Sequence, residues 1–163
     1  MRVLGIDPGY ERLGVAIIER KNNKDSVLFS VCLQTSSKLK LDKRIFELGV
    51  SIEDIIKKWN PEFLAIEKLF FTTNQKTVMG VSETKGAITF LGNRAGLKIC
   101  EYTPLQIKIA TTGYGKATKE QVIYMVTKMV SLDPSKKIKH DDEYDAIAVA
   151  LTCLVSEYPQ LGR

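Results

Sequence analysis

Four carboxylates stand at places in the sequence from which they could form one metal site. Asp7 ends an apolar run and leads into a Pro-Gly turn, and Glu67 ends a second, shorter apolar run. Asp142 and Asp145 are three residues apart, a spacing that puts both on one face of a helix. Acids brought together in this way raise each other's pKa unless a cation lies between them.

Carboxylate oxygens are the ligands that Mg²⁺ and Mn²⁺ prefer. Two such ions, about 3.5–4 Å apart, activate a water molecule and stabilise the leaving oxygen when a phosphodiester is hydrolysed. The sequence therefore predicts a site for two Mg²⁺ ions, for which Mn²⁺ substitutes, held by the four acids. Each acid also has a simpler explanation: a turn cap for Asp7, a surface acid for Glu67, and a favourable contact with the helix dipole for Asp142 and Asp145.

The polar residues next to the last two acids are given no catalytic role. Asp141 and Glu143 are expected to point away from the site, as solvated or capping residues. His140 is either a group that leans into the site or an exposed loop residue before the helix, and we favour the second interpretation.

Apolar periodicity predicts the elements that position the acids. Apolar runs predict five strands, at 2–7, 13–20, 26–34, 63–67 and 97–102. Helical spacing predicts helices at 42–59, 75–95, a short stretch from 104, 118–130, and a last one from 141 or 142 to about 157. Three meandering strands followed by helix–strand crossovers indicate an α/β fold: a mixed five-stranded sheet, with an antiparallel meander plus parallel strands and helices on both faces. This is the ribonuclease H-like arrangement. The alanines after Asp145 are small enough to let the last helix lie close to the sheet.

Composition limits the class of protein. With 163 residues and 44% hydrophobic composition, we expect a single domain over 1–163. We see no export leader and no apolar run approaching a membrane span, so we expect a cytoplasmic protein without membrane contact. Three dispersed cysteines and one histidine argue against a disulfide framework and against zinc. The net charge of +5 is mild evidence for an anionic partner.

Four motifs in order resemble those of the RuvC family, the bacterial Holliday-junction resolvases of the ribonuclease H-like superfamily, over essentially the full length. They are Gly5-Ile-Asp7-Pro-Gly9, Ala65-Ile-Glu67-Lys-Leu-Phe70, Gly113-Tyr-Gly115-Lys-Ala-Thr-Lys119 and Asp142-Glu-Tyr-Asp145-Ala-Ile-Ala148. The resemblance implies a homodimeric, Mg²⁺- or Mn²⁺-dependent endonuclease that nicks four-way DNA junctions symmetrically in recombination and repair. It also implies Asp7, Glu67, Asp142 and Asp145 as catalytic acids, and the RuvA–RuvB branch-migration complex as a partner.

The resemblance further assigns DNA contacts. Phe70 would stack on unpaired bases at the junction centre, an interaction that contributes about 1–3 kcal/mol per base. Lys108 and Lys119 would lie near the scissile phosphate, and Lys116 lies in the same glycine-containing loop as Lys119. Lys85 matches a position where relatives carry arginine, so we expect a DNA contact there as well.

Other functions remain open at this point. Sugar kinases and actin-like ATPases share the first motif but need a second phosphate loop and a second domain. A ribonuclease H-like nuclease acting on structured RNA, and a non-catalytic module that binds branched DNA, are closer alternatives. The aromatic after Glu67, the Lys119 loop and the presence of all four acids favour the junction nuclease. For the dimer surface we propose the helix at 75–95, whose glycines permit close packing against a neighbouring helix.

Overall fold

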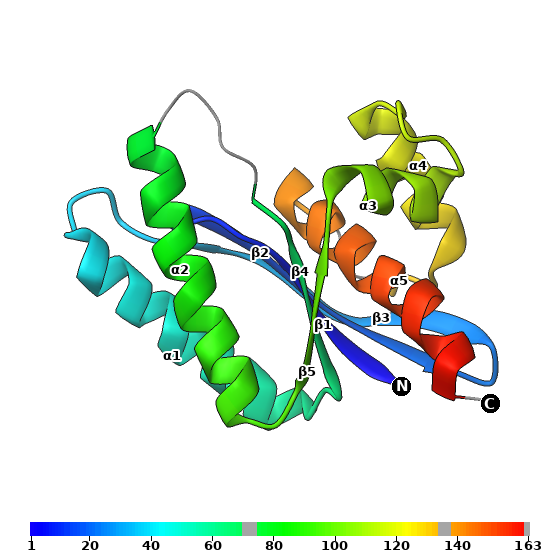
Figure 1. Ribbon diagram of the computed structural model, residues 1–163, viewed down its shortest axis with the longest axis horizontal. Coiled ribbons are helices and arrows are strands. Elements are labelled where there is room, and N and C mark those ends of the chain that lie inside the picture. The colour runs from blue at the N-terminus through cyan, green and yellow to red at the C-terminus, as the bar shows by residue number, and fades with distance from the viewer. Residues whose placement is uncertain (70–74, 134–137, 162–163) are drawn as a thin grey trace.

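The computed structural model describes residues 1–69, 75–133 and 138–161. Its centre is a five-stranded sheet in the order β3-β2-β1-β4-β5 (Figure 1). The strands β1, β2 and β3 pair antiparallel, whereas β4 pairs parallel with both β1 and β5. Their bounds are β1 (Arg2–Asp7), β2 (Arg12–Lys21), β3 (Lys24–Gln34), β4 (Phe63–Glu67) and β5 (Lys98–Tyr102). The predicted mixed sheet is thus confirmed.

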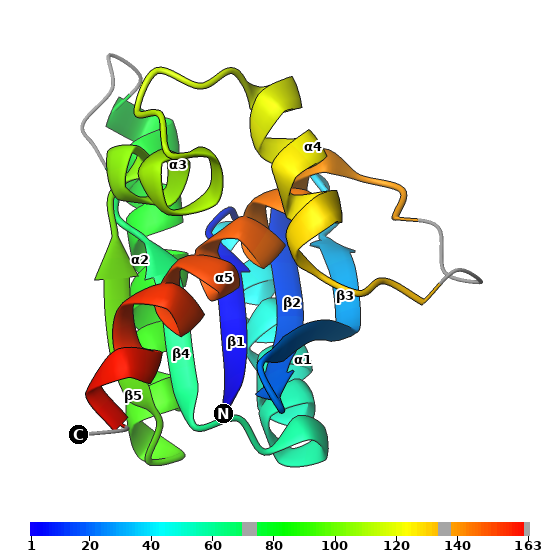
Figure 2. The ribbon, with the colours of Figure 1, turned by 90° about the vertical axis from the view of Figure 1, so that its right-hand side faces the viewer.

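Helices cover both faces of this sheet, as the sequence predicts. On one face lie α1 and α2, and on the other lie α3, α4 and α5, with α5 running across the strands (Figures 1 and 2). The bounds are α1 (Leu41–Trp59), α2 (Gln75–Arg94), α3 (Pro104–Thr112), α4 (Lys119–Met129) and α5 (Asp141–Leu161). The last helix continues four residues beyond its expected end at 157. Among the described residues, no helix is long and apolar enough to cross a membrane.

Side-chain alternation along the two central strands determines where their terminal acids point. In β1, Leu4 and Ile6 pack into the core under α1 and α2, while Val3 packs into the core under α5. The parallel register Ile6 to Ile66 gives β4 the same alternation. The last residues of both strands, both carboxylates, therefore project on the α5 side at one edge of the sheet.

Two glycines let α5 lie directly on the strands. A Cβ at Gly5 would lie 2.2 Å from the Ala146 carbonyl oxygen and 2.7 Å from the Ala150 Cβ. A Cβ at Gly14 would lie 2.1 Å from the Asp142 carbonyl oxygen. Ala146 and Ala150 are fully buried, so the expectation that small residues bring this helix close to the sheet is confirmed.

The glycines of α2 do not all serve the purpose expected from the sequence. A Cβ at Gly92 would lie within 2.9 Å of the side chains of Leu64 and Ile99, so this glycine faces the sheet and not a neighbouring helix. A Cβ at Gly80 would lie 2.9 Å from the ring of Tyr10 in the β1–β2 turn and 3.5 Å from the side chain of Leu41 in α1, whereas a Cβ at Gly86 meets nothing within 4 Å. The helix forms in spite of these residues because its inner face is packed against the sheet.

Candidate active site

A row of three residues crosses the antiparallel strands beneath the start of α5. Asp7 at the end of β1 pairs with Gly14, which in turn pairs with Cys32 on β3. Because Gly14 has no side chain, the first turn of α5 occupies the space above it, and the Asp142 backbone lies there. This contact places the acids of α5 beside the acid of β1.

Asp7 is the electrostatic centre of the four predicted acids. Burial raises the pKa of Asp7 from 3.8 to about 8, and the negative charges of Asp145, Glu67 and Asp142, in that order, push in the same direction. The ammonium of Lys119 acts in the opposite sense. The fold thus brings Glu67, Asp142 and Asp145 close enough to Asp7 for their charges to act on its carboxyl.

Two neighbouring acids are perturbed for the same reasons. Burial, followed by the charge of Asp145, raises the pKa of Glu67. Burial also raises the pKa of Asp145, although its hydrogen bond from Lys119 counteracts this effect. The Lys119 Nζ donates to Asp145 at 2.9 Å and lies 3.6 Å from Asp141. Three acids of the site therefore share a low-dielectric environment that penalises negative charge.

A cleft of about 240 Å³ opens beside these acids. Its polar lining consists of Glu67, Asp145, Lys108 and Lys119, and its apolar lining comes mainly from α3, α4 and α5. Carboxylates and ammonium groups thus face one space, which suits an anion held by lysines next to cations held by acids.

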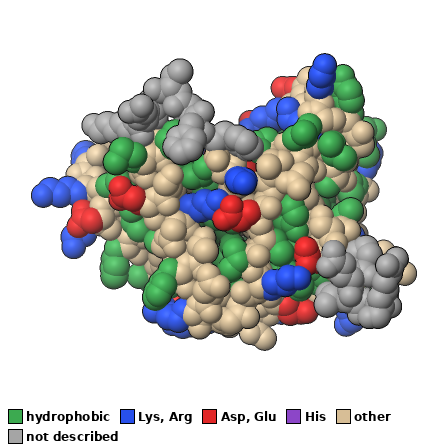
Figure 3. Space-filling model, viewed as in Figure 1, with side chains coloured by type: hydrophobic (Ala, Val, Ile, Leu, Met, Phe, Trp, Pro, Cys, Tyr) green, Lys and Arg blue, Asp and Glu red, His purple; other side chains and the backbone are tan. Residues whose placement is uncertain are grey.

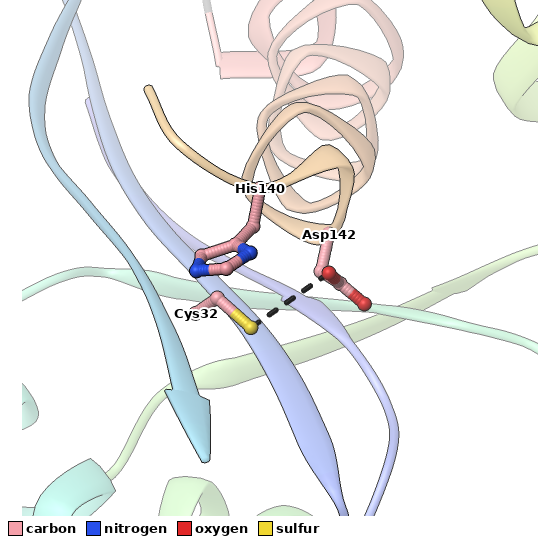
Figure 4. Close-up of side chains that lie close together, drawn as sticks. All are labelled: Cys32, His140 and Asp142. Atoms are coloured by element: carbon pink, nitrogen blue, oxygen red, sulfur yellow. Dashed lines mark hydrogen bonds between the residues drawn. The ribbon is translucent and has the colours of Figure 1, made fainter. Parts of the chain in front are cut away.

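Asp142 differs from the other three acids in the direction of its carboxylate. It forms an ion pair with Arg12, and the Cys32 Sγ donates to its Oδ2 at 3.7 Å. Of the histidine, cysteine and carboxylate ligand atoms in the described parts of the chain, one set of three lies within 4.8 Å of one another: those of Cys32, His140 and Asp142 (Figure 4). Glu67, Asp142 and Asp145 therefore surround Asp7, but the ligand atoms of the four acids do not converge on a single point.

The acids nevertheless fit a hard divalent cation. The groups of β4 and α5 whose charges raise the pKa of Asp7 are carboxylates, and carboxylate oxygen is the ligand type that Mg²⁺ and Mn²⁺ select. The raised pKa of Asp7 also indicates that the site lacks enough positive charge of its own. A bound divalent cation would supply that charge.

The other residues predicted to contact DNA differ in their surroundings. Lys85 forms a 2.9 Å ion pair with Glu101, and its side chain is only 14% exposed. Lys85 and Glu101, together with Lys68, line a separate cleft of about 450 Å³. On this face of the molecule, basic and acidic side chains lie together in the hollow between the α2 side and the α3–α4 side (Figure 3). Lys116 is exposed. Phe70 lies outside the described residues.

The prediction that Glu143 is solvated was wrong. This residue is buried, accepts a hydrogen bond from the Ser30 Oγ at 2.7 Å, and accepts another from the Lys139 backbone at 3.2 Å. The second bond is capping-like, as expected. The first arises because Ser30 and Cys32 point to the same side of β3, under α5.

Arg12 and Cys32 are site neighbours that sequence reasoning missed. The position of Arg12, shortly after the Pro-Gly turn, is a weak signal that it lies near Asp7. Cys32 carries no such signal, because its proximity depends on the register of three paired strands.

Comparison with known proteins gives a consistent result. The family model for "Crossover junction endodeoxyribonuclease RuvC" matches residues 3–153. A protein of that name from Caldanaerobacter subterraneus subsp. tengcongensis is 44% identical over 151 residues, which cover 93% of this chain and 90% of the relative. Its counterpart from Fusobacterium nucleatum is 43% identical over 93% of this chain and 79% of the relative.

Solved structures extend this similarity to the fold. Thermus thermophilus RuvC in complex with a Holliday junction substrate is similar with a TM-score of 0.87 and 30% identity, over 99% of this chain and 96% of that one. The yeast mitochondrial Holliday junction resolvase Ydc2 has a TM-score of 0.68 at 14% identity, over 93% and 76% of the two chains. At that identity the likeness concerns the fold alone.

Proposed function

The chain belongs to the RuvC family of crossover junction endodeoxyribonucleases, and on this basis we propose that it resolves four-way DNA junctions by paired, symmetric nicks. The observation that carries the proposal is the burial of Asp7 among three further acids beside a lysine-lined cleft. This combination of acids and lysines suits hydrolysis of a phosphodiester backbone and not recognition of an apolar ligand.

In this proposal Asp7, Glu67, Asp142 and Asp145 hold two Mg²⁺ ions, which Mn²⁺ can replace. When bound, such ions supply a nucleophilic hydroxide and stabilise the leaving oxygen. The buried acids of β1 and β4 are fixed by the sheet, so they keep a rigid geometry. Asp142 must turn away from Arg12 to join them, since its carboxylate is engaged there in this structure.

The lysines of the cleft position the DNA. Lys108 and Lys119 line the space next to Glu67 and Asp145, where they can hold the phosphate that is cut. Exposed Lys116 would contact the backbone farther from the reacting atoms. Lys85 would reach DNA only after leaving Glu101, so we propose a lesser contribution for it.

Symmetric nicking requires two active sites, and we propose a homodimer. Large apolar side chains are exposed on the outer layer formed by α1 and α2, as Figure 3 also shows at its left side. They are Phe46, Val50, Met79 and Phe90. This layer lies on the opposite face of the sheet from α5, so association through it leaves both clefts open. The RuvA–RuvB complex remains a partner proposed from the resemblance.

The proposal is tested with a mobile synthetic four-way junction, a duplex of related sequence and an RNA/DNA hybrid, each with and without Mg²⁺. The wild-type chain should cut the junction in two strands of like polarity, only with the metal. Asp7→Asn should bind the junction with unchanged affinity and leave it uncut, because the central carboxylate is lost.

Three outcomes of this experiment contradict the proposal. Preferential cleavage of the hybrid would favour a nuclease that acts on RNA. Tight junction binding by the wild type without any cleavage would favour a non-catalytic module. Near wild-type cutting by Asp7→Asn would remove this residue from the catalytic set.

A separate prediction concerns Phe70. Phe70→Ala should slow junction cleavage about 5- to 150-fold, because a stacking contact of about 1–3 kcal/mol per base is lost. Cleavage rates under single-turnover conditions measure the effect, and circular dichroism checks the fold. Tyr124→Ala, which removes an aromatic ring that is exposed on α4, is the matched control and should cut normally. Equal rates for the two variants would count against a stacking role.

A further inference from the structure

Three potential metal ligands of different chemistry meet at the start of α5. Cys32 comes from β3, His140 from the segment before α5, and Asp142 from its first turn (Figure 4). One ligand atom from each lies within 4.8 Å of the other two, and the Cys32 Sγ is 3.7 Å from the Asp142 Oδ2. The dispersed cysteines and single histidine of the sequence argued against zinc, but the fold brings Cys32 and His140 together beside Asp142.

The chemistry of this trio differs from that of the four acids. A thiolate, an imidazole and a carboxylate suit Zn²⁺, which binds sulfur and nitrogen, whereas Mg²⁺ prefers oxygen alone. Zinc bonds of about 2.0–2.3 Å put tetrahedral ligand atoms roughly 3.3–3.8 Å apart. The sulfur–oxygen distance already falls within that range, so small side-chain rotations complete the geometry.

A positive group already occupies this place. The Arg12 guanidinium forms an ion pair with Asp142 and lies 3.3 Å from the His140 Nδ1. Its side chain is 49% exposed, so it can turn into solvent and yield the position to a metal ion. Gln34 contacts the other ring nitrogen of His140 at 3.3 Å, which holds the ring in position.

We propose that Cys32, His140 and Asp142 form a binding site for Zn²⁺ that shares Asp142 with the magnesium-binding acids. Zinc enters as Zn²⁺, bonds to the sulfur, to one ring nitrogen and to one carboxylate oxygen, and releases the thiol proton to water. Water fills the fourth position. Because Asp142 must turn to join the other acids, Zn²⁺ that holds its carboxylate beside Cys32 and His140 inhibits the nuclease, a consequence that rests on the proposed function.

Cobalt tests the site without any reference to catalysis. Co²⁺ added to the metal-free full chain should give a saturable thiolate-to-cobalt absorption band and the visible bands of a tetrahedral centre, and Zn²⁺ should abolish them. Cys32→Ser should lose the thiolate band, and His140→Ala should weaken Co²⁺ binding at least tenfold. Cys100→Ala, which removes a cysteine from the core on β5, is the control and should keep the band.

An unchanged thiolate band in Cys32→Ser, or no saturable band in the wild type, would overturn the site. Circular dichroism on each variant shows whether it folds. If Cys32→Ser does not fold, Cys32→Ala provides the same test of the thiolate band.

Nuclease assays test the regulatory consequence. With saturating Mg²⁺, Zn²⁺ should inhibit wild-type junction cleavage, and Cys32→Ser should require at least tenfold more Zn²⁺ for the same inhibition. Equal inhibition of both chains would place zinc at the four acids and overturn the regulatory part. If no junction is cut in Mg²⁺ alone, the proposed function fails while the cobalt spectra still decide the site.

Discussion

At the scale of single residues, burial rather than sequence position makes Asp7 unusual. Its pKa is raised to about 8, chiefly by burial and then by Asp145 and the other acids. Between about pH 4 and pH 8 the Asp7 carboxyl therefore keeps its proton in the folded chain and has lost it in the unfolded chain. The contribution of this group to the free energy of unfolding is fully present below pH 4 and falls as the pH rises toward 8.

This loss of stability with rising pH gives a prediction for Asp7→Asn in the absence of divalent metal. A shift of one pKa unit corresponds to about 1.4 kcal/mol of stability, and 1 kcal/mol changes the melting temperature of a chain of this size by about 2–4 °C. The shift of Asp7 exceeds one unit. The variant should therefore melt at least about 4 °C higher than wild type at pH 8. Near pH 4 the two melting temperatures should converge. Thermal melts across this pH range check it.

Two comparisons sharpen the pH experiment. Glu83→Gln removes an exposed acid of α2 and should leave the wild-type profile unchanged. Added Mg²⁺ should stabilise the wild type more than Asp7→Asn. A melting temperature of Asp7→Asn at or below that of wild type at pH 8 would contradict the electrostatic account.

The positions of the four acids in the fold could be predicted from the sequence because each ends a recognisable apolar run or begins a helix, and their catalytic role stays a prediction. The surroundings of Asp142 could not. Arg12 and Cys32 reach it through strand pairing and through the approach of α5 to Gly14, and neither is encoded by local spacing.

At the scale of elements, the contact between α5 and the strands determines the position of two of the acids. Gly14 lies under the first turn of this helix, and the atom that blocks a larger residue is the backbone oxygen of Asp142. A backbone atom cannot rotate aside as a flexible side chain can. Any side chain at this position must lift the helix or bend the strand.

Gly14→Ala should therefore destabilise the chain by about 1–3 kcal/mol, the usual cost of overpacking, and should also reduce cleavage. Urea denaturation measures the first effect. Gly86→Ala is the matched control, because a Cβ there meets nothing within 4 Å. Alanine in an open helix position is expected to add up to about 1 kcal/mol. Equal stability of both variants would show that α5 does not depend on the close approach.

The bounds of the strands were predicted more closely than the end of the last helix. Each strand lies within two residues of its expected ends, because apolar alternation and turn residues are local signals. The role of Gly92 was predicted wrongly, because a missing side chain indicates close packing without indicating its direction. Gly92 faces the sheet, and only the three-dimensional arrangement shows this.

At the scale of the whole molecule, the two faces of the sheet carry different kinds of side chain. The α5 face carries the acids and the lysine-lined cleft, and the α1–α2 face carries exposed apolar side chains. The mixed sheet and its two helical layers could be predicted from the order of elements. The single domain over 1–163 and the RuvA–RuvB complex as a partner stay predictions.

The proposed dimer is tested by Phe90→Glu. A charge on the apolar α2 surface should oppose association, so sedimentation should show a monomer at concentrations where the wild type is a dimer. Cleavage should then yield uncoordinated single nicks. Phe90 is 62% exposed and Tyr124 on α4 is 61% exposed, so Tyr124→Glu is a matched control that should stay dimeric. A dimeric Phe90→Glu chain would move the interface elsewhere.

In the proposed function, the hydrogen bond from Lys119 to Asp145 would tie the affinity for cations to the affinity for nucleic acid. An ammonium that neutralises its own carboxylate is less available to an incoming phosphate, and a divalent ion on that carboxylate sets it free. Thermodynamic reciprocity then requires the polyanion to tighten the hold on the ion by the same factor. Substrate and metal would load cooperatively, and the protein without either would rest in a self-neutralised state.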